Sequence, residues 1–254
     1  MKMKLTILGQ GTYNPEVDVA TSGYLLETKY KKLVFDMGRG VLNNIYKNGY
    51  DYTEIDYVLI THMHPDHCND LLSYIHLLHK PPEEARKRNQ PVILFGPMGS
   101  KKKIQYLMRA CNLDIDEKKL QIREKGEDLD IKIADGMVLS VFETTHCKSL
   151  NSISFRVEEE GRVFAYSGDT TDTSGLRRAV NKSDLAVMEA TLPDDKPNYN
   201  HLSGYQAGII ANEGKVKRLV LTHIKKYNKN AFSEAKKNFH GEVIIAKDLM
   251  EVEV

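Results

Sequence analysis

The chain of 254 residues has few cysteines, no long apolar segment and no excess of charge of either sign. Its three cysteines, Cys68, Cys111 and Cys147, are odd in number and lack finger-like spacing, so we expect no disulfide framework and a reducing, cytoplasmic location. The first residues contain a five-residue apolar run, which is too short for a secretion signal, and no window approaches a membrane span. These features predict a soluble cytoplasmic protein that does not contact a membrane.

The charge balance and the glycines exclude two further classes. The 36 basic and 35 acidic residues give a net charge of +1, which argues against wholesale coating of nucleic acid. The motif GxxxxGK[ST] is absent, which excludes a P-loop ATPase, and Gly9 and Gly11 are too few to indicate nucleotide phosphates. Hydrophobic residues make up 41%, enough for a sizeable core, and we expect one domain over residues 1–254.

Short, apolar, β-branched runs recur along the chain, and four of them are followed at once by an ionisable residue. These runs are YVLIT before His62, LSVFETT before His146, RVFAYSG before Asp169 and RLVLT before His223, while LAVMEATL carries Glu189. Such runs are typical of buried strands. Because a loop at a strand end exposes a side chain that the rigid strand positions, the four endings predict one convergent site.

Helical segments lie between these strands. Residues 70–80 and 100–113 carry apolar residues at helical spacing, and residues 203–214 open with the N-cap Ser203, have Gln206 three positions later and end at Gly214. Further strands are predicted at KLTIL, SGYLLET and KKLVFD in the first third of the chain. Strands on both sides of helical segments predict an α/β fold of two central sheets with helices outside, a four-layer αββα sandwich.

The segment THMHPDHCND, residues 61–70, holds three histidines and two aspartates in ten residues. In an extended chain residues i and i+2 face the same side, so His62 and His64 can face one ion. Pro65 ends the extended segment, which puts Asp66 and His67 at the start of a helix, in place for a second ion. Imidazole nitrogen and carboxylate oxygen suit Zn²⁺, and manganese or iron fits a similar donor set.

The strand-end residues extend this set to seven candidate ligands for two metals with one shared carboxylate: His62, His64, Asp66, His67, His146, Asp169 and His223. Two ions close together can hold a bridging hydroxide and stabilise the attacking and leaving oxygens of a hydrolysis. For Cys68 and Cys147, which each follow one of these residues, we expect packing beside the site rather than ligation.

Four motifs of the chain, HMHPDH, TTHCKS, YSGDTTD and LTHIKK, resemble those of the metallo-β-lactamase superfamily in order and rough spacing. The resemblance covers nearly the whole chain and implies the αββα sandwich of that superfamily. It further implies one metal on His62, His64 and His146, with Asp169 as the bridge. The second metal would be held by Asp66, His67 and His223.

Within the superfamily the chain is similar to the ribonuclease Z branch. ILGQGTYNPE, LVFDMGRG and LFGPMGSKKKIQYL resemble three of its turns, and MEATL and NHLSGYQAG resemble the segments whose Glu and His form a dyad. The resemblance implies that this dyad is Glu189 and His201, and that the protein is a homodimer. A phosphodiester must lose an alkoxide, so an imidazolium near the leaving oxygen suits a general acid, and a carboxylate behind it raises its pKa.

The chain departs from that branch between His146 and Asp169. The 22 intervening residues, 147–168, are predicted as a plain strand–turn–strand with its turn at EEEG. Members that process tRNA usually carry a long arm in this place, and relatives without an arm include phosphodiesterases of smaller phosphate esters.

Three basic clusters are candidates for phosphate contacts, with a solvated surface as the alternative for each. They are residues 85–90, 100–103 and 225–230. The first two fall near the insertion after the histidine-rich motif, where substrate walls are often built. In the third, Lys225, Lys226 or Lys229 follows His223 closely enough to help hold a phosphate.

The sequence therefore predicts a dinuclear, zinc-dependent phosphodiesterase that acts on the 3′ end of a tRNA precursor or on a small or cyclic phosphate ester. In this hypothesis a metal-bridging hydroxide attacks phosphorus, Asp66 orients or deprotonates it, and His201, backed by Glu189, protonates the leaving oxygen. One alternative is a lactonase, thioesterase or β-lactamase-like enzyme, in which the dyad has no role. Another is a binding protein with the same fold, against which the intact ligand set argues.

Overall fold

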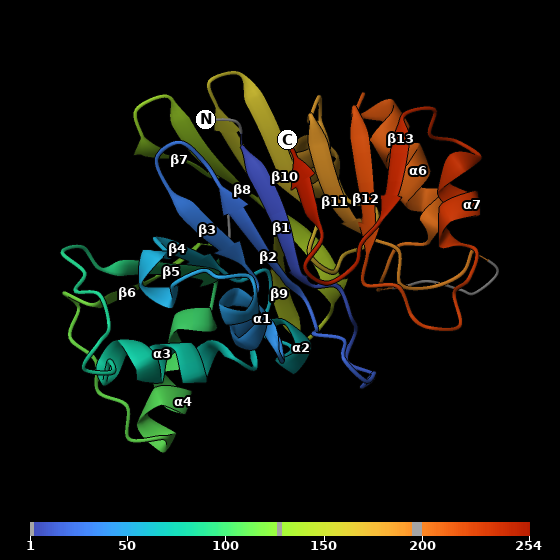
Figure 1. Cartoon of the computed structure of the whole chain (residues 1–254). Helices are drawn as coiled ribbons and strands as arrows, with labels where there is room; N and C mark the ends of the chain where they lie inside the picture. Colours follow the sequence, from blue (N-terminus) through green and yellow to red (C-terminus); the bar gives the residue numbers. More distant parts are fainter. Residues whose placement is uncertain (1–2, 126–128, 195–199) are drawn as a thin grey trace.

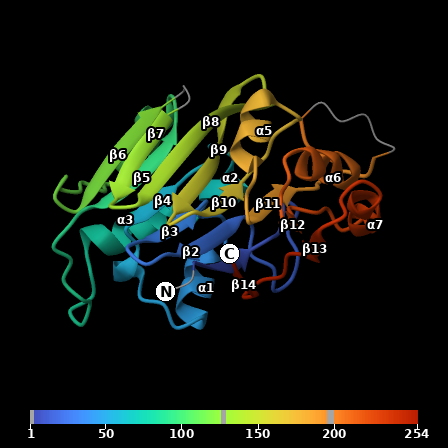
Figure 2. The same ribbon diagram turned by 90° about the horizontal axis from the view of Figure 1, so that it is seen from above.

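Two seven-stranded sheets pack face to face in the middle of the protein, and helices cover both outer surfaces (Figures 1 and 2). The computed structural model describes residues 3–125, 129–194 and 200–254. This arrangement confirms the predicted four-layer αββα sandwich.

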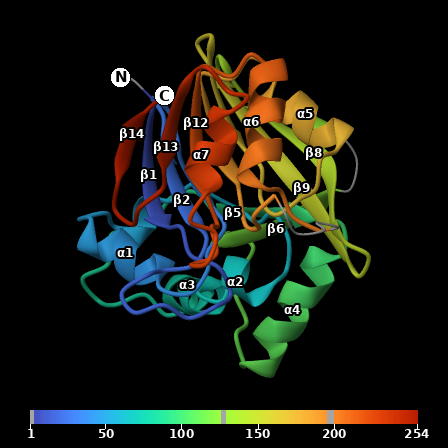
Figure 3. The same cartoon turned by 90° about the vertical axis from the view of Figure 1, so that its right-hand side faces the viewer.

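The first sheet has the strand order β14-β1-β2-β3-β4-β5-β6. Its strands are Lys4–Gly9 (β1), Gly23–Glu27 (β2), Lys32–Phe35 (β3), Tyr57–Leu59 (β4), Val92–Pro97 (β5), Leu120–Lys125 (β6) and Glu251–Glu253 (β14). Strands β3 to β6 run parallel. Because β1 pairs antiparallel with β14, with Lys4 opposite Glu253, the two ends of the chain lie side by side (Figure 3).

The second sheet has the order β13-β12-β11-β10-β9-β8-β7. Its strands are Leu129–Ala134 (β7), Met137–Cys147 (β8), Leu150–Glu159 (β9), Arg162–Tyr166 (β10), Leu185–Glu189 (β11), Arg218–Thr222 (β12) and Glu242–Ile245 (β13). Strands β7 to β10 are antiparallel and β10 to β13 are parallel. Between β9 and β10, Glu160 and Gly161 have φ of 49° and 78°, the left-handed pair of a two-residue hairpin turn, so the predicted strand–turn–strand is confirmed.

Helices flank each sheet and meet it through an apolar layer. Those beside the first sheet are Val41–Lys47 (α1), Pro65–Cys68 (α2), Leu71–His79 (α3) and Ser100–Ala110 (α4), with the short 3₁₀ helix Tyr52–Glu54 (η1); those beside the second are Ser174–Val180 (α5), Gly204–Glu213 (α6) and Ala231–Lys236 (α7). At α6 the predicted cap is present, because Ser203 Oγ accepts from the Gln206 N–H while the Gln206 side chain accepts from the Ser203 N–H. Such caps typically contribute about 1 kcal/mol. In the described residues no helix has the length and apolarity needed to cross a membrane.

The parallel strands bring their carboxyl ends to one edge of the sandwich. Strands β3, β4 and β5 end there in the first sheet, and β10, β11 and β12 end there in the second. Strand β8 runs in the same direction as β10, because β9 is antiparallel to both. The loops that carry the candidate ligands therefore meet at this edge.

The basic clusters divide between the two edges. Residues 100–103 follow β5 and residues 225–230 follow β12, so both lie at the edge with the candidate ligands. Residues 85–90 come before β5, where Arg88 contacts Asp56 and the Thr53 carbonyl ahead of β4. Because α3 returns the chain to the opposite edge of the sheet, the contacts of Arg88 favour a solvated surface, one of the two interpretations left open for residues 85–90.

Candidate metal centre

The histidine-rich segment folds as predicted around the end of β4. His62 follows the strand, and His64 is the N-cap of α2 with Pro65 in its first turn. Asp66 and His67 lie in that same helical turn, and both are buried. The change from extended chain to helix at Pro65 thus separates two pairs of side chains within six residues.

The other predicted ligands come from the second sheet. Asp169 and His223 lie in loops after β10 and β12, as predicted. His146 instead lies within β8, since the pairing of β8 with β9 continues to Cys147 opposite Leu150. The predicted end of this strand before His146 is wrong, although the side chain still reaches the common edge.

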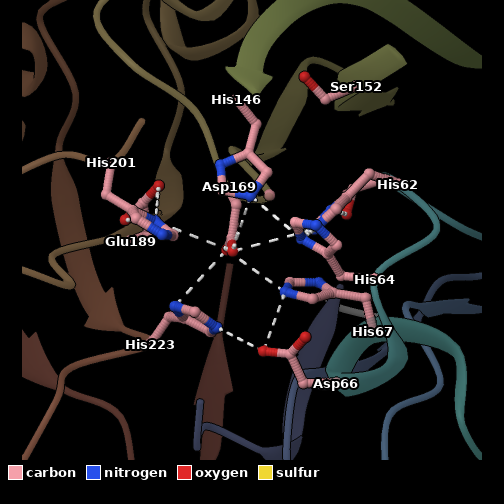
Figure 4. A network of polar contacts seen from close by, with 12 residues as sticks. His62, His64, Asp66, His67, His146, Ser152, Asp169, Glu189, His201 and His223 are labelled. Atoms are coloured by element: carbon pink, nitrogen blue, oxygen red, sulfur yellow. Dashed lines mark hydrogen bonds and ion pairs between the residues drawn. The ribbon is translucent and has the colours of Figure 1, made fainter. Parts of the chain in front are cut away.

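Three histidines form the first group of donors, shown on the right and at the top of Figure 4. His64 Nδ1 lies 3.0 Å from His62 Nε2 and 3.1 Å from His146 Nε2. Two nitrogens that bind one tetrahedral zinc at 2.0–2.1 Å lie about 3.3 Å apart. The spacing of the three nitrogens therefore suits a shared ion.

Asp66, His67 and His223 form the second group. Asp66 Oδ2 lies 3.3 Å from His223 Nε2 and 3.9 Å from His67 Nε2. His67 Nε2 is buried and has no hydrogen-bond partner among the described residues. Such an orphaned nitrogen is costly unless a ligand or ion satisfies it.

Asp169 lies between the two groups, at the centre of the ring of imidazoles in Figure 4. Its Oδ2 is 4.0 Å from both His62 Nε2 and His146 Nε2. Its Oδ1 is 3.4 Å from His67 Nε2 and 3.6 Å from His223 Nδ1. One carboxylate oxygen thus faces each group, which is the arrangement of a bridging ligand.

Three residues for which the sequence predicted no role accept hydrogen bonds from the imidazoles of the centre. The Nδ1–H of His67 donates to Asp36 (2.7 Å), that of His146 to the Asn200 carbonyl (2.8 Å) and that of His223 to Thr191 Oγ1 (2.9 Å). Such contacts fix the ring and leave Nε2 for a metal. Asp36 follows the buried run LVF, so the strand-end pattern that found Asp169 could also have found Asp36.

The pKa shifts fit an ionised carboxylate among imidazoles. Burial lowers the pKa of His62 well below its ordinary value and lowers that of His64. Burial disfavours the charged forms of His67 and Asp169, but the attraction between the two side chains outweighs burial. This attraction raises the pKa of His67, and together with His223 it lowers the pKa of Asp169. Burial thus favours the neutral imidazoles of His62 and His64, while Asp169 stays ionised, and such nitrogen and carboxylate donors fit divalent metal ions.

Glu189 and His201 lie beside this centre, on the left of Figure 4. Glu189, at the end of β11, accepts from His201 Nδ1 at 3.0 and 3.1 Å and from the Thr170 N–H at 2.7 Å. Burial lowers the pKa of His201, but Glu189 outweighs burial and raises it to about 9. Glu189 and His201 therefore contact each other as predicted for the dyad, and His201 Nδ1 lies 3.8 Å from Asp169 Oδ2.

The cysteines next to the predicted ligands make other contacts. Cys68 Sγ donates to the His64 carbonyl at 3.2 Å, and Cys147 Sγ lies 3.4 Å from Ser149 Oγ. Neither belongs to the His/Asp/Glu groups with metal-like spacing in the described chain. Burial raises the pKa of the Cys68 thiol to about 11.

Comparison with known proteins supports this assignment of the fold. The chain is 25% identical to a ribonuclease Z of Nitrosopumilus maritimus over an alignment of 305 positions, which covers 99% of this chain and 100% of the relative. Its structure resembles the metallo-beta-lactamase fold protein YhfI from Bacillus subtilis, with a TM-score of 0.84, 23% identity and 99% of each chain covered. It also resembles the short form of human tRNase Z, with a TM-score of 0.80, 23% identity and 98% of each chain covered.

The model of the beta-lactamase superfamily domain matches residues 33–224. This range runs from β3 to just after β12, and so includes every predicted metal ligand and both residues of the dyad. Since the match spans well over half of the sequence, the chain belongs to the beta-lactamase superfamily domain family.

Proposed function

We propose that this protein is a dinuclear metal-dependent phosphodiesterase, which processes tRNA 3′ ends or hydrolyses small or cyclic phosphate esters. The observation that carries the proposal is the pair of donor groups joined by Asp169, with the His201–Glu189 dyad on one side. Relatives named ribonuclease Z, among them the 25% identical protein above, add support.

In this proposal each donor group holds one ion. His62, His64 and His146 hold the first, Asp66, His67 and His223 hold the second, and Asp169 contacts both. The donor spacing and the orphaned His67 Nε2 support this assignment. The nitrogen-rich set favours zinc, with manganese or iron as alternatives.

Divalent ions in such a site lower the pKa of a water molecule and stabilise charge on phosphoryl oxygens. The side chains contribute the remaining steps. Asp66 orients or deprotonates the attacking water. His201 protonates the leaving oxygen, and Glu189 holds the proton on His201 Nδ1 and keeps the ring charged at neutral pH.

The short connection between β9 and β10 favours the smaller substrates. Glu160 and Gly161 form the whole turn, and 22 residues separate His146 from Asp169. A tRNA would have to be bound without an arm at this place, whereas a small or cyclic diester needs only the centre itself.

The test begins with the metal-loaded wild type. Its metal content is measured, followed by hydrolysis of a dinucleotide, a 3′-extended tRNA precursor, cyclic nucleotides and a lactone. We expect about two metals per chain and hydrolysis of phosphodiesters. Hydrolysis of the lactone alone would favour the lactonase alternative and contradict the proposal.

Variants then separate the dyad from the ligands. His201→Ala should lower kcat on the dinucleotide about 10²–10⁴-fold with metal content retained, because general acids contribute that much. Asp169→Ala should lose metal. His240→Ala, at an exposed histidine, is the matched control. Unchanged turnover in His201→Ala would refute the general-acid role.

A further inference from the structure

Tyr13 is an exposed aromatic side chain in a loop whose backbone is hydrogen-bonded to that of His223. Its side chain is 65% exposed, in the loop that follows β1. The base of this loop is held where the Gly11 N–H donates to the Ala20 carbonyl at 2.9 Å, and the Gln10 carbonyl accepts from the His223 N–H at 3.1 Å. Tyr13 thus lies three residues beyond a backbone contact to one of the proposed ligands.

Lys225 reaches the same place from the second sheet. Its Nζ lies 5.1 Å from the centroid of the Tyr13 ring, within the range of a cation–π contact. Lys225 comes two residues after His223, whose N–H donates to the Gln10 carbonyl. The segments that carry Tyr13 and Lys225 therefore both begin at this backbone hydrogen bond. An exposed aromatic ring and a cation therefore lie together at the edge of the centre.

The backbone of Lys225 is tied to the strand end that carries Glu189. The Lys225 N–H donates to the Thr191 carbonyl at 3.4 Å, and the Lys225 carbonyl accepts from the Asn228 N–H at 2.7 Å. Asn228 Nδ2 in turn donates to the Ala190 carbonyl at 3.0 Å. Because Ala190 and Thr191 directly follow Glu189, Lys225 lies on the dyad side of the centre.

We propose that Tyr13 and Lys225 form a subsite for a nucleoside on the leaving-group side, where Tyr13 stacks on the base and Lys225 contacts the adjoining phosphate. This inference rests on the proposed function, in which His201 protonates the leaving oxygen. An aromatic ring offers a stacking surface that every base can use, and an ammonium group pairs with phosphate. The substrate class that fits the pair is a nucleotide diester rather than a phosphate ester of a simple alcohol.

The kinetic test uses two substrates that differ in the bases alone. They are the deoxyadenosine dinucleotide and its abasic analogue, in which tetrahydrofuran replaces both nucleosides. For each variant we compare kcat/KM for the dinucleotide divided by kcat/KM for the abasic analogue. Tyr13→Ala should lower this ratio about tenfold, because one stacked base contributes an effect of that order, and Tyr13→Phe should keep the ratio. Lys225→Ala should lower kcat/KM for both substrates alike, and Lys225→Arg should restore part of it.

A second lysine–tyrosine pair supplies the matched control. Lys29 Nζ lies 5.0 Å from the Tyr30 ring, whose side chain is 40% exposed, in the turn between β2 and β3 at the opposite edge of the sheet. Tyr30→Ala should keep the substrate ratio of the wild type. A ratio within twofold of wild type in Tyr13→Ala, or an equal loss in Tyr30→Ala, would overturn the subsite.

A binding measurement separates failure of the subsite from failure of the proposed function. If the wild type hydrolyses neither the dinucleotide nor its abasic analogue, the phosphodiesterase proposal fails. The subsite is then tested by calorimetry, which compares the binding of adenosine 5′-monophosphate and ribose 5-phosphate to the metal-loaded protein. The subsite predicts about tenfold tighter binding of the nucleotide by wild type and a loss of that difference in Tyr13→Ala. Equal affinities in the wild type overturn it.

Discussion

At the scale of single residues, Asp36 connects several parts of the centre. Its buried carboxylate accepts from the Thr61 N–H (2.8 Å), His67 Nδ1 (2.7 Å) and the Tyr166 hydroxyl (2.7 Å). Thr61 Oγ1 also donates to it and lies 3.1 Å from His62 Nδ1. One carboxylate therefore orients, directly or through Thr61, an imidazole of each donor group.

Asp36→Asn should weaken metal binding, since the new amide NH₂ cannot accept the hydrogen bonds that one carboxylate oxygen accepts. We expect the affinity for zinc to fall about 10–100-fold, the usual effect of changing a residue that holds a ligand. Competition with a chelator measures it. Tyr166→Phe, which removes one of the donors to Asp36, should have a smaller effect, and equal affinities in wild type and Asp36→Asn would contradict this role.

Glu189 should control the alkaline limit of activity. Burial lowers the pKa of His201, and Glu189 opposes this and raises the pKa to about 9, so the imidazolium persists until the pH passes that value. Glu189→Gln removes the charge, which lowers the pKa, and the alkaline limb of kcat on the dinucleotide should move to lower pH. Glu213→Gln, at an exposed carboxylate, is the control. A limb that stays in place would show that Glu189 does not act through His201.

At the scale of elements, the turn after β10 holds Asp169 against the first sheet. Gly168 has φ of 59°, and a Cβ added there would lie 2.7 Å from Thr61 Cβ and Cγ2. Glycine is needed both for the left-handed backbone and for this close approach. The sheets are therefore joined at the centre by a turn with no room for a side chain.

Gly168→Ala should destabilise the protein and reduce its metal content, because the new methyl group pushes Asp169 and Thr61 apart. The matched control is Gly49→Ala, since Gly49 has φ of 77° but nothing in the described chain within 4 Å of the added Cβ. The control should lose about 1 kcal/mol through backbone strain and bind metal normally. Thermal unfolding and metal analysis measure both effects, and normal metal content in Gly168→Ala would disprove the steric argument.

At the scale of the whole molecule, three apolar layers bind the four layers of structure together. The layer between the sheets includes Phe35 and Phe155, whose ring centroids lie 5.7 Å apart. Two others join each sheet to its helices. Because Leu5 of β1 and Val252 of β14 belong to the middle layer, we propose that residues 1–254 form one domain.

A single domain should unfold in a single transition. We expect the metal-free protein to lose far-UV circular dichroism and tyrosine fluorescence at the same denaturant concentration, since both sheets share the middle layer. The 13 tyrosines and the absence of tryptophan make tyrosine emission a direct probe. Two separated transitions would show that the sheets fold independently.

The sequence by itself determined the strands that lead to the candidate ligands, the helices over residues 70–80, 100–113 and 203–214, and the donor types of the centre. Buried strands appear as β-branched runs, and the cap of α6 depends on Ser203 and Gln206, residues close together in the chain. The predicted donors meet because the parallel strands of both sheets end at one edge. That these donors bind two metals stays a prediction.

The tertiary structure decided which distant residues support the centre. The contacts of Asp36 with Tyr166, of Thr191 with His223 and of Lys225 with Tyr13 join segments between 32 and 212 residues apart. It also placed residues 85–90 at the far edge. Local patterns cannot predict such pairs, because they depend on how two sheets stack and which side chains then face each other.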